Sequence, residues 1–178
     1  MADANGKTDW MIWNFGPDLN WDDELKRDFN ALHSEADTIL LSRKMAVEGF
    51  IGHWAAVAEK PEQEYAFARN ITAARKVVFT KTLASAEWKN TTLAKGDFME
   101  EVNRLKAQDG KDLIAYGGAS FVSSLIKARL IDEYHLLINP TALGNGIAVF
   151  GEAGDRLNLK LIQAKAYRCG MAVLMYTM

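Results

Sequence analysis

The hydrophobic residues of this chain fall into two patterns that alternate along it. Short continuous apolar runs predict buried strands at Thr38–Leu41, Lys76–Thr80, Asp112–Tyr116 and Glu133–Asn139, and a shorter run predicts another strand at Thr91–Ala94. Between these runs, apolar residues recur at helical spacing. Buried strands separated by helices predict a largely parallel sheet that is covered by helices on both faces.

The predicted helices begin at recognisable signals. Asn20 is a candidate N-cap for the first helix, and Asp97 with Glu100 resembles a capping box that opens a later one. Further helices are predicted over residues 44–51, 62–71 and 119–129. His53 and Trp54 are predicted to lie in the loop that follows the first of these three.

The C-terminal stretch Leu159–Met178 alternates apolar and polar residues around Cys169-Gly170, which predicts an antiparallel hairpin. The predicted fold class is therefore α/β, with a three-layer α/β/α arrangement and a mixed sheet that includes this hairpin. A chain of 178 residues is long enough for one well-packed domain, so a single domain over residues 1–178 is expected.

Composition and charge narrow the function classes. Lys+Arg 21 against Asp+Glu 23 leaves a net charge of -2, without the basic excess of proteins that bind nucleic acid. Cys169 is the single cysteine and the three histidines are far apart, so no metal site is expected. No signal peptide is recognisable, and no apolar run reaches the ~20 residues that span a bilayer. We therefore expect a cytoplasmic protein with a small-molecule partner.

The turn Tyr116-Gly117-Gly118-Ala119-Ser120 lies between a predicted strand and a predicted helix. The unpaired N–H groups at the start of a helix attract anions, and glycines let a phosphate approach the backbone closely. Two interpretations are open at this point. The glycine pair either receives a phosphate group or only makes a tight strand-to-helix turn.

A longer stretch that includes this turn resembles a known family. From Gly117-Gly118 onward the chain carries Leu130–Glu133, Pro140, Leu143–Gly146 and Phe150 in the order found in the reductase domain of bacterial riboflavin biosynthesis proteins. That domain belongs to the wider dihydrofolate-reductase-like superfamily. The resemblance implies a dihydrofolate-reductase-like fold and NADPH as the cofactor.

The resemblance also implies which residues bind the cofactor. Residues after the third long strand would hold the pyrophosphate, residues after the second would take the adenosine 2′-phosphate, and a turn after the first would face the phosphates. These candidates are Gly117, Gly118, Ala119, Ser120 and Phe121, then Thr80, Lys81 and Thr82, and finally Arg43 and Lys44 after Ser42. Lys81 can equally be an ordinary solvated loop lysine.

The chain departs from the family pattern at two places. Many riboflavin reductases carry an acidic residue directly before the glycine pair, where this chain has Tyr116, so Tyr116 is a candidate substrate contact. Trp13 is a second candidate, because it flanks the entry to the first helix, where superfamily members place the substrate; it can equally close the mouth of the core or a dimer interface. Relatives also begin with an apolar strand, whereas Met1–Gly6 resembles only the polar segment that follows it. We therefore expect the first strand to be missing or truncated, with an apolar strand of roughly 6 residues encoded upstream.

Two functions are consistent with these observations. The first is an NADPH-dependent reductase that transfers a hydride to a small heterocyclic or sugar-linked substrate, either a pterin or a riboflavin-precursor pyrimidine. No proton donor is identified, although Asp22 and Asp23 in the first helical turn are candidates. The alternative is a nucleotide-binding module without catalysis. Relatives of this type are commonly dimers, so a homodimer formed through the C-terminal hairpin is expected.

Overall fold

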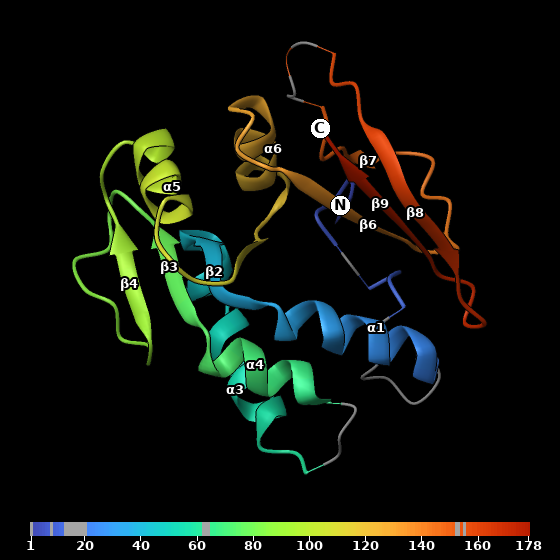
Figure 1. Cartoon of the computed structure of the whole chain (residues 1–178), viewed down its shortest axis with the longest axis horizontal. Coiled ribbons are helices and arrows are strands. Elements are labelled where there is room, and N and C mark those ends of the chain that lie inside the picture. The colour runs from blue at the N-terminus through green and yellow to red at the C-terminus, as the bar shows by residue number, and fades with distance from the viewer. Residues whose placement is uncertain (1, 8, 13–20, 62–64, 152–153, 155) are drawn as a thin grey trace. The chain divides into compact units, whose positions relative to one another are not determined.

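The computed structural model describes residues 2–7, 9–12, 21–61, 65–151, 154 and 156–178 (Figure 1). The chain divides into two compact units, Arg27–Val122 and the pair of segments Met1–Lys26 and Ser123–Met178. Parallel strands build the first unit and antiparallel strands build the second. The predicted α/β class is confirmed, with its parallel and antiparallel strands in separate sheets.

The unit Arg27–Val122 is built on a four-stranded parallel sheet. Its strands, in spatial order, are β4 (Thr91–Ala94), β3 (Arg75–Phe79), β2 (Ala36–Ser42) and β5 (Asp112–Tyr116). All four were predicted from apolar runs. The two central strands β2 and β3 are the most buried, as expected for parallel strands that are covered on both faces.

The helices of this unit differ from the prediction at one place. They are α2 (Arg43–Val47), α3 (Phe50–Ala58), α4 (Ala66–Ala73) and α5 (Phe98–Lys106). The predicted helix over residues 44–51 is wrong in its extent, because Gly49 adopts a left-handed conformation with φ +103° and separates α2 from α3. His53 and Trp54 therefore lie in α3 and not in a loop, and Ile51, Trp54 and Val57 form its buried face.

Helices cover both faces of the parallel sheet. Ser42 pairs with Phe79, and the preceding residue Leu41 pairs with Tyr116, so Phe79 and Tyr116 point to opposite faces. Tyr116 contacts the ring of Phe50 in α3, whereas Phe79 contacts the ring of Phe98 in α5. The predicted three-layer α/β/α arrangement is thus present within this unit.

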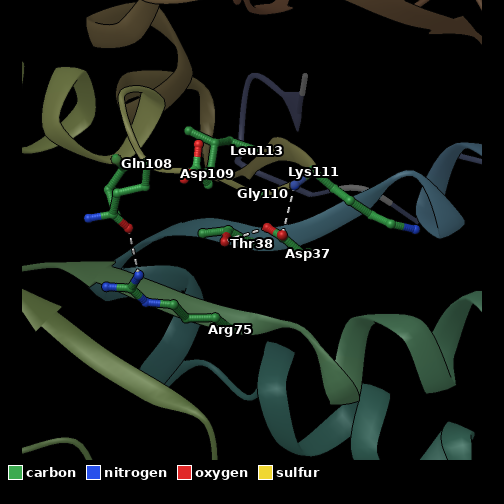
Figure 2. Close-up of a pocket in the computed structure, with 9 residues that line it drawn as sticks. Asp37, Thr38, Arg75, Gln108, Asp109, Gly110, Lys111 and Leu113 are labelled. Atoms are coloured by element: carbon green, nitrogen blue, oxygen red, sulfur yellow. Dashed lines mark hydrogen bonds between the residues drawn. The ribbon is translucent and has the colours of Figure 1, made fainter.

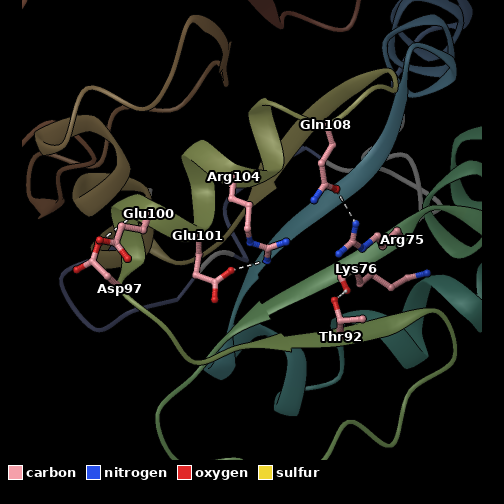
Figure 3. Close-up of polar contacts among 8 residues, drawn as sticks. All are labelled: Arg75, Lys76, Thr92, Asp97, Glu100, Glu101, Arg104 and Gln108. Carbon is pink, nitrogen blue, oxygen red and sulfur yellow. Dashed lines mark hydrogen bonds and ion pairs between the residues drawn. The ribbon is translucent and has the colours of Figure 1, made fainter.

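A buried lysine ties α4 to the sheet. Lys76 on β3 is 2% exposed, and its Nζ donates to the carbonyl oxygens of Thr72 at 2.6 Å and Ala74 at 2.7 Å. These carbonyls lie at the C-terminal end of α4, where a cation is favoured. Burial lowers the pKa of Lys76 to about 8. The backbone carbonyl of Lys76 accepts a hydrogen bond from the Thr92 hydroxyl, which links β3 to its neighbour β4 (Figure 3).

The second unit contains the predicted C-terminal hairpin. Its main sheet has the order β6 (Glu133–Ile138), β9 (Ala172–Thr177) and β8 (Lys160–Ala166), and every neighbouring pair is antiparallel. A separate two-stranded sheet joins β1 (Ala2–Asp3) to β7 (Gly146–Ile147). Two further helices, α1 (Asp23–Ser34) and α6 (Ala119–Lys127), run across the boundaries between the units in sequence.

The edge strand β5 has an unusual composition for its position. Within the described residues no strand pairs with its outer side, and yet Leu113, Ile114 and Ala115 form an apolar run that is only half-buried. Apolar strands of this kind are typical of the interior of a parallel sheet. The missing first strand stays a prediction.

The helices are short. In the described part of the chain, α1 is the longest with 12 residues. None of the helices described there has the length and apolar composition that a membrane crossing requires.

Candidate functional site

Three loops leave the parallel sheet side by side at its carboxyl edge. β3, β2 and β5 are neighbours, and the pairing of Ser42 with Phe79 and of Leu41 with Tyr116 brings their last residues level. The segments that follow these strands are residues 80–82, the start of α2 at 43–44, and the turn into α6 at 117–121. The structure therefore brings together the three segments that the resemblance assigned to the cofactor, at the edge where open parallel sheets bind ligands.

The two glycines after β5 differ in their surroundings. A Cβ added at Gly117 would lie 2.4 Å from Cδ1 of Phe121, so this position needs glycine for packing. A Cβ added at Gly118 would meet nothing within 4 Å. The Gly118 carbonyl accepts hydrogen bonds from the N–H groups of Phe121 and Val122, which starts α6. The sequence left two roles open for the glycine pair. The packing role applies to Gly117, whereas Gly118 has open space at its Cβ position.

The first turn of α6 presents its backbone to the exterior at Gly118 and Ser120, both of which are exposed. Ala119 between them is half-buried. The N–H groups at the start of a nine-residue helix and the positive end of its dipole favour an anion there. This turn is exposed at Gly118 and Ser120 and has the polarity that favours an anion.

Phe121 supports the turn from beneath. Its ring lies 5.5 Å from that of Phe79 and 5.8 Å from that of Phe98, measured between centroids, in a cluster on the α5 face of the sheet. Its N–H bonds to the Gly118 carbonyl at 3.0 Å. Among the predicted cofactor residues, Phe121 is thus placed to shape the turn from the interior.

Lys81 carries a positive charge that is held at the carboxyl end of β4. Its Nζ donates to the carbonyl oxygens of Lys95 and Gly96, each at 2.7 Å. An ammonium group has three donors, and these bonds use two of them. Lys81 is exposed, and its fixed ammonium lies on the loop after β3 that the resemblance assigned to the 2′-phosphate.

Thr80 fixes the conformation of the same loop. It is buried, and its Oγ1 accepts hydrogen bonds from the N–H groups of Thr82 and Leu83, both at 3.1 Å. Thr82 is exposed. The first threonine therefore shapes the loop, and the second lies where a ligand can reach it.

The loop after β2 turns directly into α2. The Ser42 hydroxyl oxygen accepts the N–H of Met45 at 3.1 Å and caps this five-residue helix. Arg43 and Lys44 are exposed, and Lys44 pairs with Glu48 at 3.8 Å. The predicted turn at Arg43 and Lys44 is thus the start of α2, and two cationic side chains lie there between the other two segments.

The sequence did not predict a buried hydrogen-bonded pair, His33 and Tyr116, at the end of β5. The Tyr116 hydroxyl bonds to Nε2 of His33, and His33 Nδ1 lies 2.7 Å from the carbonyl oxygen of Phe29. Burial lowers the pKa of His33, which is 3% exposed, and raises the pKa of the Tyr116 phenol. The predicted substrate role of Tyr116 therefore concerns its ring, since its hydroxyl is bound inside the unit.

The sequence carried a signal for His33 that was not used. His33 lies four residues after Phe29 and eight after Leu25, on the apolar stripe of α1. A histidine within such a stripe is expected to be buried and to need a hydrogen-bond partner. The identity of that partner depends on tertiary packing and is not readable from spacing.

The remaining candidates lie elsewhere. Trp13 is outside the described residues. Asp22 accepts the N–H of Leu25 at 2.9 Å and the N–H of Cys169 at 3.0 Å. Burial by itself would raise the pKa of Asp22, but the backbone donors together hold it below its ordinary value. Asp22 is therefore a helix cap that also ties the hairpin turn.

The amino edge of the same sheet holds a cavity of about 280 Å³ (Figure 2). Its polar side chains bond within the protein. The Asp37 carboxylate accepts the Lys111 N–H and the Thr38 hydroxyl, each at 2.8 Å, and Arg75 donates to Gln108 at 3.1 Å. These contacts join the loop after α5 to the starts of β2 and β3, which indicates a structural role.

Comparison with known proteins defines the class of this fold and site. Residues 1–173 match the RibD C-terminal domain, and the chain belongs to that family. The uncharacterized protein YyaP of Bacillus subtilis (strain 168) is 31% identical over 172 residues, which cover 97% of this chain and 85% of that protein. A second B. subtilis protein, YwjB, is 31% identical over 54% of each chain.

Solved structures show the same fold. A protein from Shewanella sp. PV-4 named as a riboflavin biosynthesis protein has a TM-score of 0.70 at 21% identity, covering 99% of this chain and 90% of its own. A diaminohydroxyphosphoribosylaminopyrimidine deaminase/5-amino-6-(5-phosphoribosylamino)uracil reductase from Thermotoga maritima has a TM-score of 0.60 at 14% identity, covering 99% of this chain and 52% of its own. At these identities the solved structures show a shared fold, and the family model shows the family.

Proposed function

We propose that this protein is an NADPH-dependent reductase whose carboxyl edge binds the cofactor. The observation that carries the proposal is Gly118, which opens α6 with no atom within 4 Å of the position that a Cβ would take. A diphosphate could approach the backbone there as closely as it does in other glycine-rich turns.

The segments that follow β3 and β2 supply positive charge at the same edge of the sheet. Lys81 offers a fixed ammonium for the 2′-phosphate, and the exposed Thr82 offers a hydroxyl. Arg43 and Lys44 lie at the start of α2, directly after the central strand β2, at the same edge. When bound, NADPH would supply the hydride for a C=N or C=O carbon, and these residues would orient it.

The proposed substrate is a small heterocycle, either a pterin or a pyrimidine of the riboflavin pathway. The family supports this class, and one of the solved relatives is named as a reductase of a phosphoribosylamino-uracil. Tyr116 replaces the acidic residue of many such reductases and would offer an aromatic ring edge near the glycine turn.

A nucleotide-binding module without catalysis is the second candidate. The specific observation in its favour is that two possible proton donors are already in use: the Tyr116 hydroxyl bonds to His33, and Asp22 caps α1. A reductase of this design would take its proton from water.

NADPH titration of Gly118 variants tests the proposal. Gly118→Asp adds a negative charge where the diphosphate would lie, and we expect the Kd for NADPH to rise at least tenfold, or about 1.4 kcal/mol. Gly118→Asn has nearly the same shape without the charge and should raise the Kd less. Unfolding midpoints should stay unchanged, because an added side chain meets open space.

The outcomes separate the two candidates. Oxidation of bound NADPH on addition of dihydrofolate or a pyrimidine substrate supports the reductase, and tight binding without turnover supports the module. An unchanged Kd in a folded Gly118→Asp variant would contradict both.

We also propose a homodimer through the antiparallel sheet. Ile138 on β6 is 42% exposed, and Leu161 and Ile162 on β8 are 51% and 52% exposed. The register shift after Leu161 leaves these two adjacent apolar residues on an edge strand. Light scattering should show a dimer, and Leu161→Lys should shift it to a monomer. A monomeric wild type would overturn this proposal.

A further inference from the structure

We propose that His33 and Tyr116 are a positioning pair that fixes the end of β5 and thereby aligns the Gly117-Gly118 turn. The proposal rests on the proposed function, because alignment of the turn matters through the cofactor bound there. Tyr116 would then act by fixing the turn that follows it, while its hydroxyl stays bonded to His33 and is not offered to the substrate.

The hydrogen bonds of the pair allow one arrangement of protons. His33 Nδ1 lies 2.7 Å from the Phe29 carbonyl oxygen, which can only accept, so Nδ1 carries the hydrogen. In the neutral ring Nε2 is then an acceptor, and the Tyr116 hydroxyl donates to it. The chain from Phe29 through His33 to Tyr116 therefore has a defined direction.

Aromatic packing keeps water from replacing these bonds. The His33 ring lies 4.2 Å from that of Phe29 and 5.9 Å from that of Phe67, and the Tyr116 ring lies 5.1 Å from that of Phe50, measured between centroids. His33 is 3% exposed. A buried acceptor that loses its donor keeps the full cost of desolvation, so the structure strongly favours the bonded position of Tyr116.

The turn is held from both faces of the sheet. Tyr116 is fixed by His33 on the α1 and α3 face, and the next residue, Gly117, is packed against Phe121 on the α5 face. Between these two anchors the backbone has little freedom before Gly118. The direction of the N–H groups at the start of α6 thus follows from the pair.

The chain offers a matched control. Tyr134 is 5% exposed, and its buried hydroxyl has no hydrogen-bond partner in the described structure. Tyr134→Phe removes a buried tyrosine hydroxyl just as Tyr116→Phe does, but without breaking a hydrogen bond. Any general effect of losing such a group should appear in both variants.

The test measures amide hydrogen exchange and NADPH binding in the full chain. Tyr116→Phe should speed exchange at the Phe121 and Val122 amides, which bond to the Gly118 carbonyl, and Tyr134→Phe should not. The Kd and KM for NADPH should rise about fivefold in Tyr116→Phe, as expected for the loss of one hydrogen bond, while kcat falls by less than about twofold.

A second variant separates positioning from simple stability. Tyr116→Phe with His33→Phe leaves no imidazole nitrogen without its hydroxyl donor, so it should recover the unfolding midpoint but keep the fast exchange and the raised KM. Recovery of all three by this double variant would overturn the proposal, as would normal exchange in Tyr116→Phe. If the wild type binds no NADPH, the proposed function fails while the exchange data still decide whether the pair holds the turn.

Discussion

The two edges of the parallel sheet in Arg27–Val122 use their polar residues in different ways. At the amino edge, Asp37 accepts from Lys111 and Thr38, and Arg75 donates to Gln108, so the groups that line the cavity are partners of one another. At the carboxyl edge, polar and cationic side chains lie on exposed loops around an open turn. Internal pairing marks a cluster that holds the fold together, and open backbone at the start of a helix marks a place for a ligand.

Among substitutions that test this difference between the edges, we expect the largest loss of stability at Gly117. Gly117→Ala places a Cβ 2.4 Å from the Phe121 ring, and such overpacking should cost about 2–3 kcal/mol in the free energy of unfolding. Gly118→Ala, one residue further, should change it by less than about 0.5 kcal/mol. Urea unfolding of the two variants is the measurement.

The double variant Gly117→Ala with Phe121→Ala checks the cause. If the clash with Phe121 is responsible, alanine at both positions should cost less than the sum of the two single changes. Strict additivity would show that Gly117 is needed for another reason.

At the amino edge, Asp37→Ala should lower the free energy of unfolding by about 1.5–2 kcal/mol, because the carboxylate accepts hydrogen bonds from Lys111 and Thr38. NADPH affinity should be unchanged. A variant that keeps its stability but loses NADPH binding would reverse the roles that we assign to the two edges.

The same carboxylate predicts a pH dependence. The Lys111 N–H and the Thr38 hydroxyl lower the pKa of Asp37 in the folded state. Its stabilising effect is therefore present above the unfolded pKa of about 3.9 and is lost as the pH falls through the lower folded value. The difference in stability between wild type and Asp37→Ala should shrink in acid; a difference that grows there would contradict this assignment.

The smallest effect is expected at Lys81. This lysine is exposed, so its attraction to a 2′-phosphate is screened by solvent and should contribute about 1 kcal/mol, or about fivefold in Kd. Lys81→Ala should weaken NADPH binding by that factor and leave NADH binding almost unchanged. Equal loss for both cofactors in parallel titrations would show that Lys81 only supports the loop.

The sequence predicted the strands well because each is a compact apolar run. β2, β3, β4 and β5 all fall within two residues of the predicted ranges, and the C-terminal hairpin is confirmed. Helix boundaries were less predictable. The left-handed Gly49 separates α2 from α3 within one predicted helix. The sequence does not show whether a glycine in a helical pattern continues the helix or ends it.

The candidate site was predictable in outline but not in its details. Strand order at the carboxyl edge follows from topology, and the family resemblance named the three loops. The different surroundings of Gly117 and Gly118 depend on where the Phe121 ring packs, and the bond between His33 and Tyr116 joins residues 83 positions apart. Contacts of this kind arise from tertiary packing, for which spacing along the chain gives no signal.

Backbone NMR of the wild type during NADPH titration tests the central claim most directly, because it reads both edges of the sheet in one spectrum. We expect the largest shifts at the amides of Gly118 and Ala119, smaller ones at Thr82, and none at Gly110 or Lys111. Shifts confined to Gly110 and Lys111, or a silent Gly118 amide at saturating NADPH, would contradict the assignment of the cofactor to the carboxyl edge.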